Sequence, residues 1–226
     1  MHPALAGISL VVFDLDGTLI DSAPDLAVAV DATLAERDLL PAGVDKVRHW
    51  VGNGSHKLVE RALADALGAA AESLDAGEID AAHDRFLAYY ADAPCERTQL
   101  YDGVHECLEA MRERNIACVL VTNKPVAFLP AILEQFTLAS FFALTLGGDS
   151  LSEKKPHPAP LLHAAEHTGV APARALMVGD SRHDVQAGKA AGFRTLAVTY
   201  GYNHGEPIAD SAPDHVTDSL AVLAAD

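Results

Sequence analysis

The sequence predicts an α/β fold in which a doubly wound parallel sheet forms the core and an all-helical segment is inserted after the first strand. Two observations lead to this prediction. Ile8–Phe13 is a continuous apolar run, typical of a strand buried on both faces. From about residue 100, helical patterns alternate with short apolar runs, which indicates parallel strands covered by helices. We therefore assign residues 1–20 and 95–226 to the core and residues 21–94 to a helical cap.

The inserted segment has helix signals and no strand signal. Its first helix is expected to start at Ser22 as N-cap, because Pro24 fits the first turn and Asp25 lies near the positive end of the helix dipole. Apolar residues then recur at helical spacing through Leu34. Three further helices are expected here: Val44–Trp50, Ser55–Leu67 and Glu78–Ala93.

The remaining chain alternates between the two kinds of element. The expected helices are Val104–Arg114, Val126–Phe136, Pro158–Thr168 and Asp184–Ala191, and the expected strands are Ile116–Val121, Ala143–Leu146, Ala175–Val178 and Thr195–Val198. In sheets of this type, ligands bind beyond the carboxyl ends of the strands. The residues that directly follow each strand are therefore the candidate functional residues.

Composition and charge exclude several classes of partner. A formal net charge of −16 argues against binding to nucleic acid or to an anionic membrane surface, since both need clustered Lys and Arg. Three cysteines, with no C-x-x-C pair, fit buried thiols in a reducing compartment. No leader or membrane-spanning run is apparent, so we expect a cytoplasmic protein, and the sequence leaves monomer and homodimer open.

Two carboxylates follow the first strand at a spacing of two residues. If the chain stays extended, Asp14 and Asp16 point to the same side, and Gly17 allows a sharp turn out of the sheet. Like charges so close need a cation or a shared proton, which indicates a divalent metal and acid/base chemistry. The alternative is an ordinary Asp-Gly turn at the end of a core strand.

Polar residues also follow the later strands. Thr122, Asn123 and Lys124 come after the second core strand, and Asp180, Ser181 and Asp184 come after a later one. Between these groups, Lys155 lies on a loop next to a proline. Any one of these could be a helix cap or a solvated surface residue, but together they could form one site. Carboxylate oxygens suit Mg²⁺, and the set as a whole is typical of phosphoryl transfer.

Histidines offer a weaker alternative. His163 and His167 are four residues apart on a predicted helix, but the H-E-x-x-H pattern is absent, so we expect them to be exposed rather than zinc ligands. His183 is expected to be a loop residue that points to solvent.

At this point four segments resemble the motifs of the haloacid dehalogenase superfamily, in its phosphatase branch: FDLDGTL (13–19), VTNK (121–124), KPHP (155–158) and VGDSRHD (178–184). The spacing is also similar, with a helical cap between the first and second motifs. The resemblance implies a Rossmann-like core, a small phosphate ester as substrate and Mg²⁺ as cofactor.

The resemblance also implies roles for individual residues. Asp14 would be the nucleophile that forms an aspartyl-phosphate, and Asp16 would be the general acid and then the general base. Mg²⁺ would be held by the carboxylates of Asp14 and Asp180 and by the backbone carbonyl of Asp16. Asp184 and Ser181 would not bind the metal directly, and Asp184 would orient the water molecules on it. The remaining implied roles are phosphate binding by Thr122 and the amide of Asn123, and charge neutralisation beside Asp14 by Lys155.

Within the superfamily, residues 50–54 (WVGNG) and 200–205 (YGYNHG) resemble bacterial phosphoglycolate phosphatases. The substrate carboxylate would then meet the Gly52-Asn53-Gly54 loop at a helix N-terminus, with Arg48 or Lys57 adding charge. The alternative is a tight turn between two cap helices. Other open alternatives are a sugar-phosphate phosphatase and a phosphomutase, whereas a phospho-acceptor module or a dehalogenase would not need Asp16.

Overall fold

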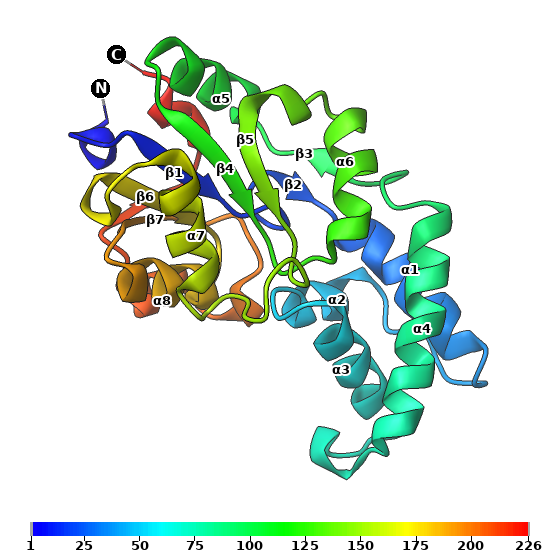
Figure 1. Ribbon diagram of the computed structural model, residues 1–226. Coiled ribbons are helices and arrows are strands. Elements are labelled where there is room, and N and C mark those ends of the chain that lie inside the picture. The colour runs from blue at the N-terminus through cyan, green and yellow to red at the C-terminus, as the bar shows by residue number, and fades with distance from the viewer. Residues whose placement is uncertain (1, 226) are drawn as a thin grey trace.

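The computed structural model describes residues 2–225, and within them the main sheet has six strands, all parallel. Their order is β5-β4-β1-β6-β7-β8 (Figure 1). The strands are β1 (Leu10–Phe13), β4 (Ala117–Val121), β5 (Phe142–Leu146), β6 (Ala175–Gly179), β7 (Arg194–Val198) and β8 (His215–Thr217). The prediction of a doubly wound α/β fold is therefore confirmed.

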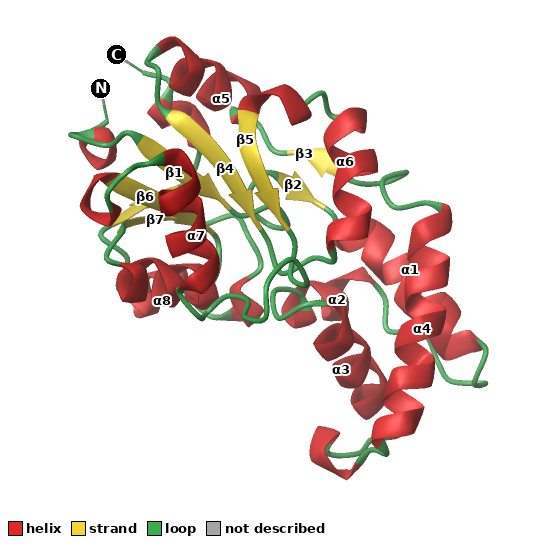
Figure 2. Ribbon diagram, in the orientation of Figure 1, coloured by secondary structure: helices red, strands yellow, loops and turns green. Residues whose placement is uncertain are grey.

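Helices surround the sheet and also form a group beside it (Figure 2). Around the sheet lie α5 (Val104–Glu113), α6 (Leu129–Gln135), α7 (Ala159–Thr168) and α8 (Arg182–Ala191). The separate group consists of α1 (Ala23–Ala35), α2 (Val44–Trp50), α3 (Ser55–Leu67) and α4 (Ala76–Asp92). Short 3₁₀ helices span Pro3–Leu5, Ala71–Ser73, Val126–Phe128, Ala139–Phe141, Pro172–Arg174, Asn203–Gly205, Ile208–Ser211 and Leu220–Leu223. No helix in residues 2–225 is long and apolar enough to span a membrane.

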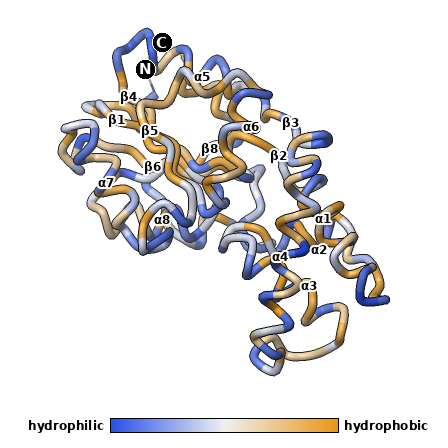
Figure 3. Tube along the Cα trace, turned by 45° about the vertical axis from the view of Figure 1, so that its right-hand side comes forward, coloured by the Kyte–Doolittle hydropathy of each residue, from blue (hydrophilic) through white to orange (hydrophobic). Residues whose placement is uncertain are grey.

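The central strands are apolar throughout because helices cover both faces. Val11 and Phe13 of β1 belong to a core that includes residues of α5, whereas Leu10 and Val12 belong to a second core with residues of α7 and α8. Alternate side chains of a strand point to opposite faces, so one strand supplies both cores. The tube in Figure 3 is correspondingly orange along the central strands.

The group α1–α4 is joined to the rest of the chain by a two-stranded antiparallel ribbon of β2 (Ile20–Asp21) and β3 (Gln99–Leu100). The Asp25 carboxylate reinforces this junction by accepting the backbone N–H groups of Arg97 and Thr98 at 2.7–3.0 Å. Asp25 thus ties the outgoing chain to the first turn of α1. The four helices lie beyond the carboxyl ends of the sheet strands, toward which the arrowheads of β4 and β5 point (Figure 2).

Most expected elements differ from the structure by one or two residues at an end, and two of these differences have a clear physical reason. The first strand begins at Leu10 rather than Ile8, because the Ile8 N–H bonds to the Leu5 carbonyl at 3.1 Å in a preceding turn. The helix expected over 126–136 is a 3₁₀ turn followed by α6, which begins next to Pro130. Proline lacks an N–H and fits only the first turn of an α-helix, so the α-helical part starts later than its apolar pattern suggests.

Three short strands were not expected from the sequence. β2 and β3 have two residues each and pair through their backbones, and β2 ends at Asp21, the first residue of the region predicted to contain no strand. β8 has three residues, of which Val216 is 44% exposed, so it lacks the continuous buried run that indicates the other strands. These strands depend on tertiary pairing and not on a local pattern.

The strand order defines where a ligand site can form. From β1 the chain proceeds to β4 and β5 at one edge, and then returns to β6 on the other side of β1. The order therefore reverses between β1 and β6. In doubly wound sheets, a crevice opens at the carboxyl ends of the strands at this switch point.

Candidate active site

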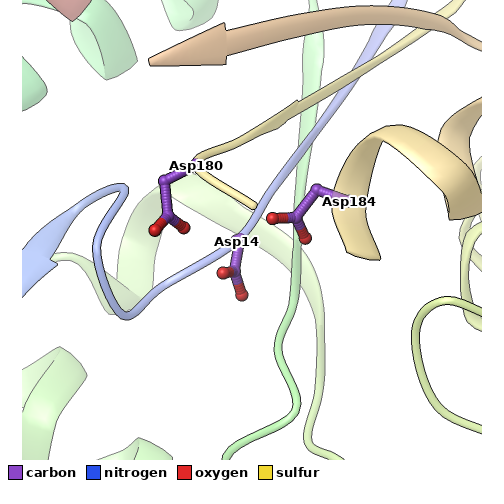
Figure 4. A group of neighbouring side chains, drawn as sticks. All are labelled: Asp14, Asp180 and Asp184. Atoms are coloured by element: carbon purple, nitrogen blue, oxygen red, sulfur yellow. The ribbon is translucent and has the colours of Figure 1, made fainter. Parts of the chain in front are cut away.

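Three buried carboxylates meet at the switch point between β1 and β6 (Figure 4). Asp14 directly follows β1, Asp180 directly follows β6, and Asp184 lies in the first turn of α8. One oxygen of each carboxylate lies within 4.8 Å of the other two. The three residues are 8%, 3% and 1% exposed, so water screens their mutual repulsion poorly. We refer to Asp14, Asp180 and Asp184 as the carboxylate cluster.

Asp180 is held by two hydrogen bonds and two glycines. The Thr18 hydroxyl donates to one of its oxygens at 3.1 Å, and the Tyr202 backbone N–H donates to the other at 2.7 Å. A Cβ at Gly201 would lie 2.1 Å from the Asp180 Cβ. At Gly17, where φ is +84°, a Cβ would lie 2.4 Å from an Asp180 oxygen. The chain can approach Asp180 this closely only with glycine at both positions.

Lys155 bridges two members of the cluster. Its Nζ lies 2.8 Å from Asp14 Oδ1 and 2.7 Å from Asp184 Oδ1, and the residue is 3% exposed, so it is not a solvated surface lysine. The other Asp184 oxygen accepts from the N–H and the hydroxyl of Ser181 at 3.0 and 2.6 Å. These contacts form a capping box at the start of α8. Asp184 therefore caps its own helix and also faces the cluster.

The cluster is short of positive charge. Burial raises the pKa of Asp14; Lys155 offsets part of this effect and Asp184 adds to it. Burial also raises the pKa of Asp180 well above its usual value, and the neighbouring Asp184 and Asp14 raise it further. For Lys155, burial disfavours the ammonium but the two carboxylates outweigh burial, so its pKa is raised. The Lys155 ammonium contacts two of the three buried carboxylates, Asp14 and Asp184.

This donor set fits a divalent cation. Carboxylate oxygens are hard ligands, and a small hard cation is held by one or two carboxylates together with water and substrate phosphate. A divalent charge would also compensate the carboxylates that Lys155 leaves unbalanced. The residues that could hold a metal are therefore Asp14, Asp180 and Asp184.

We expect Lys155→Met to lower the free energy of unfolding by about 3–5 kcal/mol, because removing one partner of a buried ion pair leaves the other charge uncompensated. Denaturant unfolding in EDTA measures this effect without contribution from bound metal. The matched control is Lys154→Met at the exposed neighbouring position, for which a change within about 0.5 kcal/mol is expected. Wild-type stability of Lys155→Met would contradict the assigned pairing.

Asp16 contacts a different lysine. Lys124 Nζ lies 2.8 Å from Asp16 Oδ1, and the Ser22 hydroxyl donates to the same oxygen. Ser22 is the N-cap residue of α1, as predicted, but its side chain makes no cap hydrogen bond. Its hydroxyl instead fixes Asp16. The sequence assigned no role to Lys124; its only signal was its place directly after Thr122 and Asn123.

A pocket opens in front of Asp14 and Asp16, with about 480 Å³ of empty space including its mouth. Thr122, Asn123 and Lys124 line it from the end of β4, together with Gly52, Gly54 and Ser55 from the loop before α3 and its first residue. The rest of the wall is largely apolar and includes Leu26, Leu58, Phe86, Tyr90 and Phe128. The pocket thus has a charged floor and an apolar wall, which is typical of a small-molecule site.

The loop between α2 and α3 is tied to the core from two directions. The Asn123 side-chain amide donates to the backbone carbonyls of Gly52 and Lys155, both at 2.9 Å. On the other side, Asn53 Nδ2 lies 2.7 Å from His183 Nε2. His183 is 8% exposed and lies in α8, so the prediction of a solvent-facing loop residue is wrong. Its imidazole contacts the loop instead of water.

Arg48 and Lys57 have partners away from the pocket. Arg48 is paired with Asp21 at 2.6 Å, and Lys57 is paired with Glu60 at 2.6 Å. Neither lines the pocket, so the structure does not bring these two cations to the site. Asp21 neutralises the charge of Arg48, and Glu60 neutralises that of Lys57. Among the cap residues proposed from sequence, only Gly52 and Gly54 line the pocket.

The remaining histidine and cysteine expectations have mixed outcomes. His163 and His167 are exposed, as predicted. Cys107 and Cys118 are buried, whereas Cys95 is only partly buried. All three cysteines are free thiols.

Comparison with known proteins identifies the class. The family model of haloacid dehalogenase-like hydrolases matches residues 8–192. The match covers most of the chain and all four superfamily motifs, from residue 13 to residue 184. This protein belongs to the haloacid dehalogenase-like hydrolases.

The chain is also similar to individual members. It is 48% identical over 218 residues to the phosphoglycolate phosphatase of Pseudomonas putida, covering 95% of this chain and 78% of the relative. Identity to the phosphoglycolate phosphatase of Nitrosococcus oceani is 47% over 213 residues, with 93% and 92% covered. A crystal structure described as a predicted phosphoglycolate phosphatase from Haemophilus somnus 129pt superimposes with a TM-score of 0.89 at 39% identity, over 95% of this chain and 96% of that one. The protein is thus an enzyme similar to phosphoglycolate phosphatases.

Proposed function

We propose that the protein is a Mg²⁺-dependent phosphomonoester hydrolase that acts through an aspartyl-phosphate and converts 2-phosphoglycolate to glycolate and phosphate. The observation that supports this most strongly is the separation of two acids at one strand end. Asp14 is paired with Lys155 and lies in the carboxylate cluster, whereas Asp16 is paired with Lys124, and both acids line the pocket. Two neighbouring carboxylates with different partners suit two different roles.

In the first half-reaction, an Asp14 oxygen attacks phosphorus and the bond from phosphorus to the ester oxygen breaks. Asp16 donates a proton to the departing oxygen, so the leaving group departs as an alcohol. Lys155, 2.8 Å from Asp14, balances part of the negative charge at the reacting centre. Thr122 and the backbone amide of Asn123 would hold the phosphate oxygens at the end of β4.

In the second half-reaction, Asp16 is the carboxylate left by that proton transfer. It takes a proton from a water molecule, whose oxygen attacks phosphorus while the bond to Asp14 breaks. The products are inorganic phosphate and the original Asp14 carboxylate. Lys124 and Ser22 hold one Asp16 oxygen, so the other remains available for the proton.

Mg²⁺, bound by Asp14, Asp180 and the Asp16 backbone carbonyl, would supply charge neutralisation on the phosphoryl oxygens. Asp184, with Ser181 behind it, would orient metal-bound water. Its contacts with Lys155 and Ser181 keep the carboxylate in one orientation.

We propose that residues 21–94 act as a cap over the core of residues 1–20 and 95–226, and that this cap recognises the carboxylate end of the substrate. The cap would exclude bulk water from the reacting groups. Gly52 and Gly54 line the pocket, and α3 begins without a side-chain cap. Its free N–H groups and its dipole favour an anion such as a carboxylate. Asn53 would hold this loop closed through its contact with His183.

The test is a substrate panel of 2-phosphoglycolate, hexose phosphates and phenyl phosphate, assayed with Mg²⁺ and with excess EDTA. We expect the highest kcat/KM for 2-phosphoglycolate and loss of all activity in EDTA, restored by Mg²⁺, because two carboxylates hold Mg²⁺ with modest affinity. Preference for a hexose phosphate would refute the substrate, isomerisation of a sugar phosphate would indicate a mutase, and full activity in EDTA would refute the metal dependence.

A further inference from the structure

Tyr90 has a buried hydroxyl without a hydrogen-bond partner. Its ring, on α4, stacks on Phe86 at a centroid distance of 5.8 Å and meets Phe128 edge-on at 4.9 Å. The residue is 1% exposed, and within residues 2–225 its hydroxyl makes no hydrogen bond. A buried hydroxyl left unsatisfied costs about 1–3 kcal/mol, although a phenylalanine would pack equally well here. The polar atom therefore needs an explanation other than core packing.

Tyr90 belongs to the same pocket as the two acids. Tyr90 lines this pocket together with Asp16 and Lys124. The Lys124 ammonium lies 4.8 Å from the Tyr90 ring centroid, donates a hydrogen bond to Asp16 and also interacts with the Tyr90 hydroxyl, whose own proton stays free. Since an ammonium carries three protons and a phenol one, this wall of the pocket has more donors than the protein itself satisfies.

The hydrogen-bond donors of this wall suit a ligand with acceptor oxygens, such as a carboxylate. Burial raises the pKa of Tyr90 to about 12, so its hydroxyl stays protonated and able to donate. The nearest fixed cation is Lys124, and the N-terminus of α3 at Ser55 lines the same pocket. Arg48 and Lys57 are paired away from the pocket, whereas Lys124 lines the pocket and is paired with Asp16 there.

We propose that the Tyr90 hydroxyl donates a hydrogen bond to the carboxylate of the substrate, with the Lys124 ammonium beside it, and that Tyr90 thereby selects esters whose leaving group carries a carboxylate. This inference rests on the proposed hydrolysis of 2-phosphoglycolate. It adds a substrate-binding residue from α4 to the Gly52–Gly54 loop that lines the same pocket.

The test is Tyr90→Phe, assayed with 2-phosphoglycolate and with phenyl phosphate, which has no carboxylate. The variant removes one oxygen and keeps the ring, so we expect an unchanged or higher melting temperature. For 2-phosphoglycolate, kcat/KM should fall about 10- to 100-fold, because a hydrogen bond to a charged group is lost. The loss should be mainly in KM, since the carboxylate is bound in both ground and transition states. With phenyl phosphate the change should be below about twofold.

The matched control is Tyr89→Phe on the same helix, whose hydroxyl donates to Glu36 at 2.6 Å away from the pocket. It should leave both substrates unaffected. Equal losses of Tyr90→Phe on both substrates, or no loss on either, would overturn the inference and leave the proposed function standing. A wild-type enzyme that hydrolyses phenyl phosphate but not 2-phosphoglycolate would refute the proposed substrate, and this inference with it.

Discussion

Asp14→Asn is expected to lower kcat/KM by roughly 10⁴-fold or more, because an amide oxygen cannot form the covalent intermediate on which the proposed route depends. The protein should nevertheless fold. Asp14 lies at the exit of β1, and the variant removes one of the three mutually repelling buried carboxylates while Lys155 stays paired with Asp184. Its melting temperature in EDTA should therefore equal or exceed that of the wild type.

Steady-state kinetics with 2-phosphoglycolate and acid-quenched detection of the phosphoenzyme measure this effect. The matched control is Asp149→Asn, an exposed aspartate that follows β5 and accepts the Val126 N–H at 2.7 Å. An asparagine can still accept that bond, so the control should keep near-normal activity. A folded Asp14→Asn enzyme with comparable turnover would exclude Asp14 as the nucleophile.

The fold could be predicted from the sequence to the extent that its elements are locally patterned. The buried runs of β1, β4 and β6 and the helices Val44–Trp50 and Ser55–Leu67 follow from apolar spacing alone, and the structure has these two helices with the predicted bounds. β2, β3 and β8 could not be predicted, because two or three residues carry no periodicity and depend on a distant partner.

Some residues of the site could likewise be predicted from the sequence, and others could not. Asp14, Asp16, Asp180 and Asp184 stand out because each follows a strand, and parallel strands bring their ends together. Tyr90 could not be found, because an aromatic residue on an apolar helix face has the pattern of a core residue. The ion pairs could not be predicted from the sequence either. No local pattern indicates that Arg48 pairs with Asp21, or that Lys124 is the cation that lines the pocket.

The contact between Asn53 and His183 joins residues 130 positions apart. Each residue looks like part of an ordinary turn or helix start when it is considered by its neighbours alone. Only the folded chain shows that the loop before α3 reaches α8. The geometry of the proposed cap therefore depends on tertiary packing, whereas the chemistry of its core depends on short motifs.

Asp16→Asn is expected to slow turnover of 2-phosphoglycolate by about 10²–10⁴-fold, the usual contribution of general acid–base catalysis. The amide keeps an oxygen for the Lys124 ammonium and the Ser22 hydroxyl, so the local structure is preserved. It has no exchangeable carboxyl proton to give to the leaving group and is too weak a base to activate water. Both half-reactions should therefore be slowed with this substrate.

The leaving group distinguishes the two roles of Asp16. With p-nitrophenyl phosphate, whose leaving group departs without protonation, Asp16→Asn should form the phosphoenzyme at nearly the wild-type rate and then hydrolyse it slowly. Stopped-flow measurement should show a burst of p-nitrophenolate close to the enzyme concentration, followed by a slow steady state. The wild type, in which Asp16 can activate water, is the control and should show a faster steady state. If phosphoenzyme formation were slowed equally for p-nitrophenyl phosphate and 2-phosphoglycolate, Asp16 would be an electrostatic or positioning group and not the general acid.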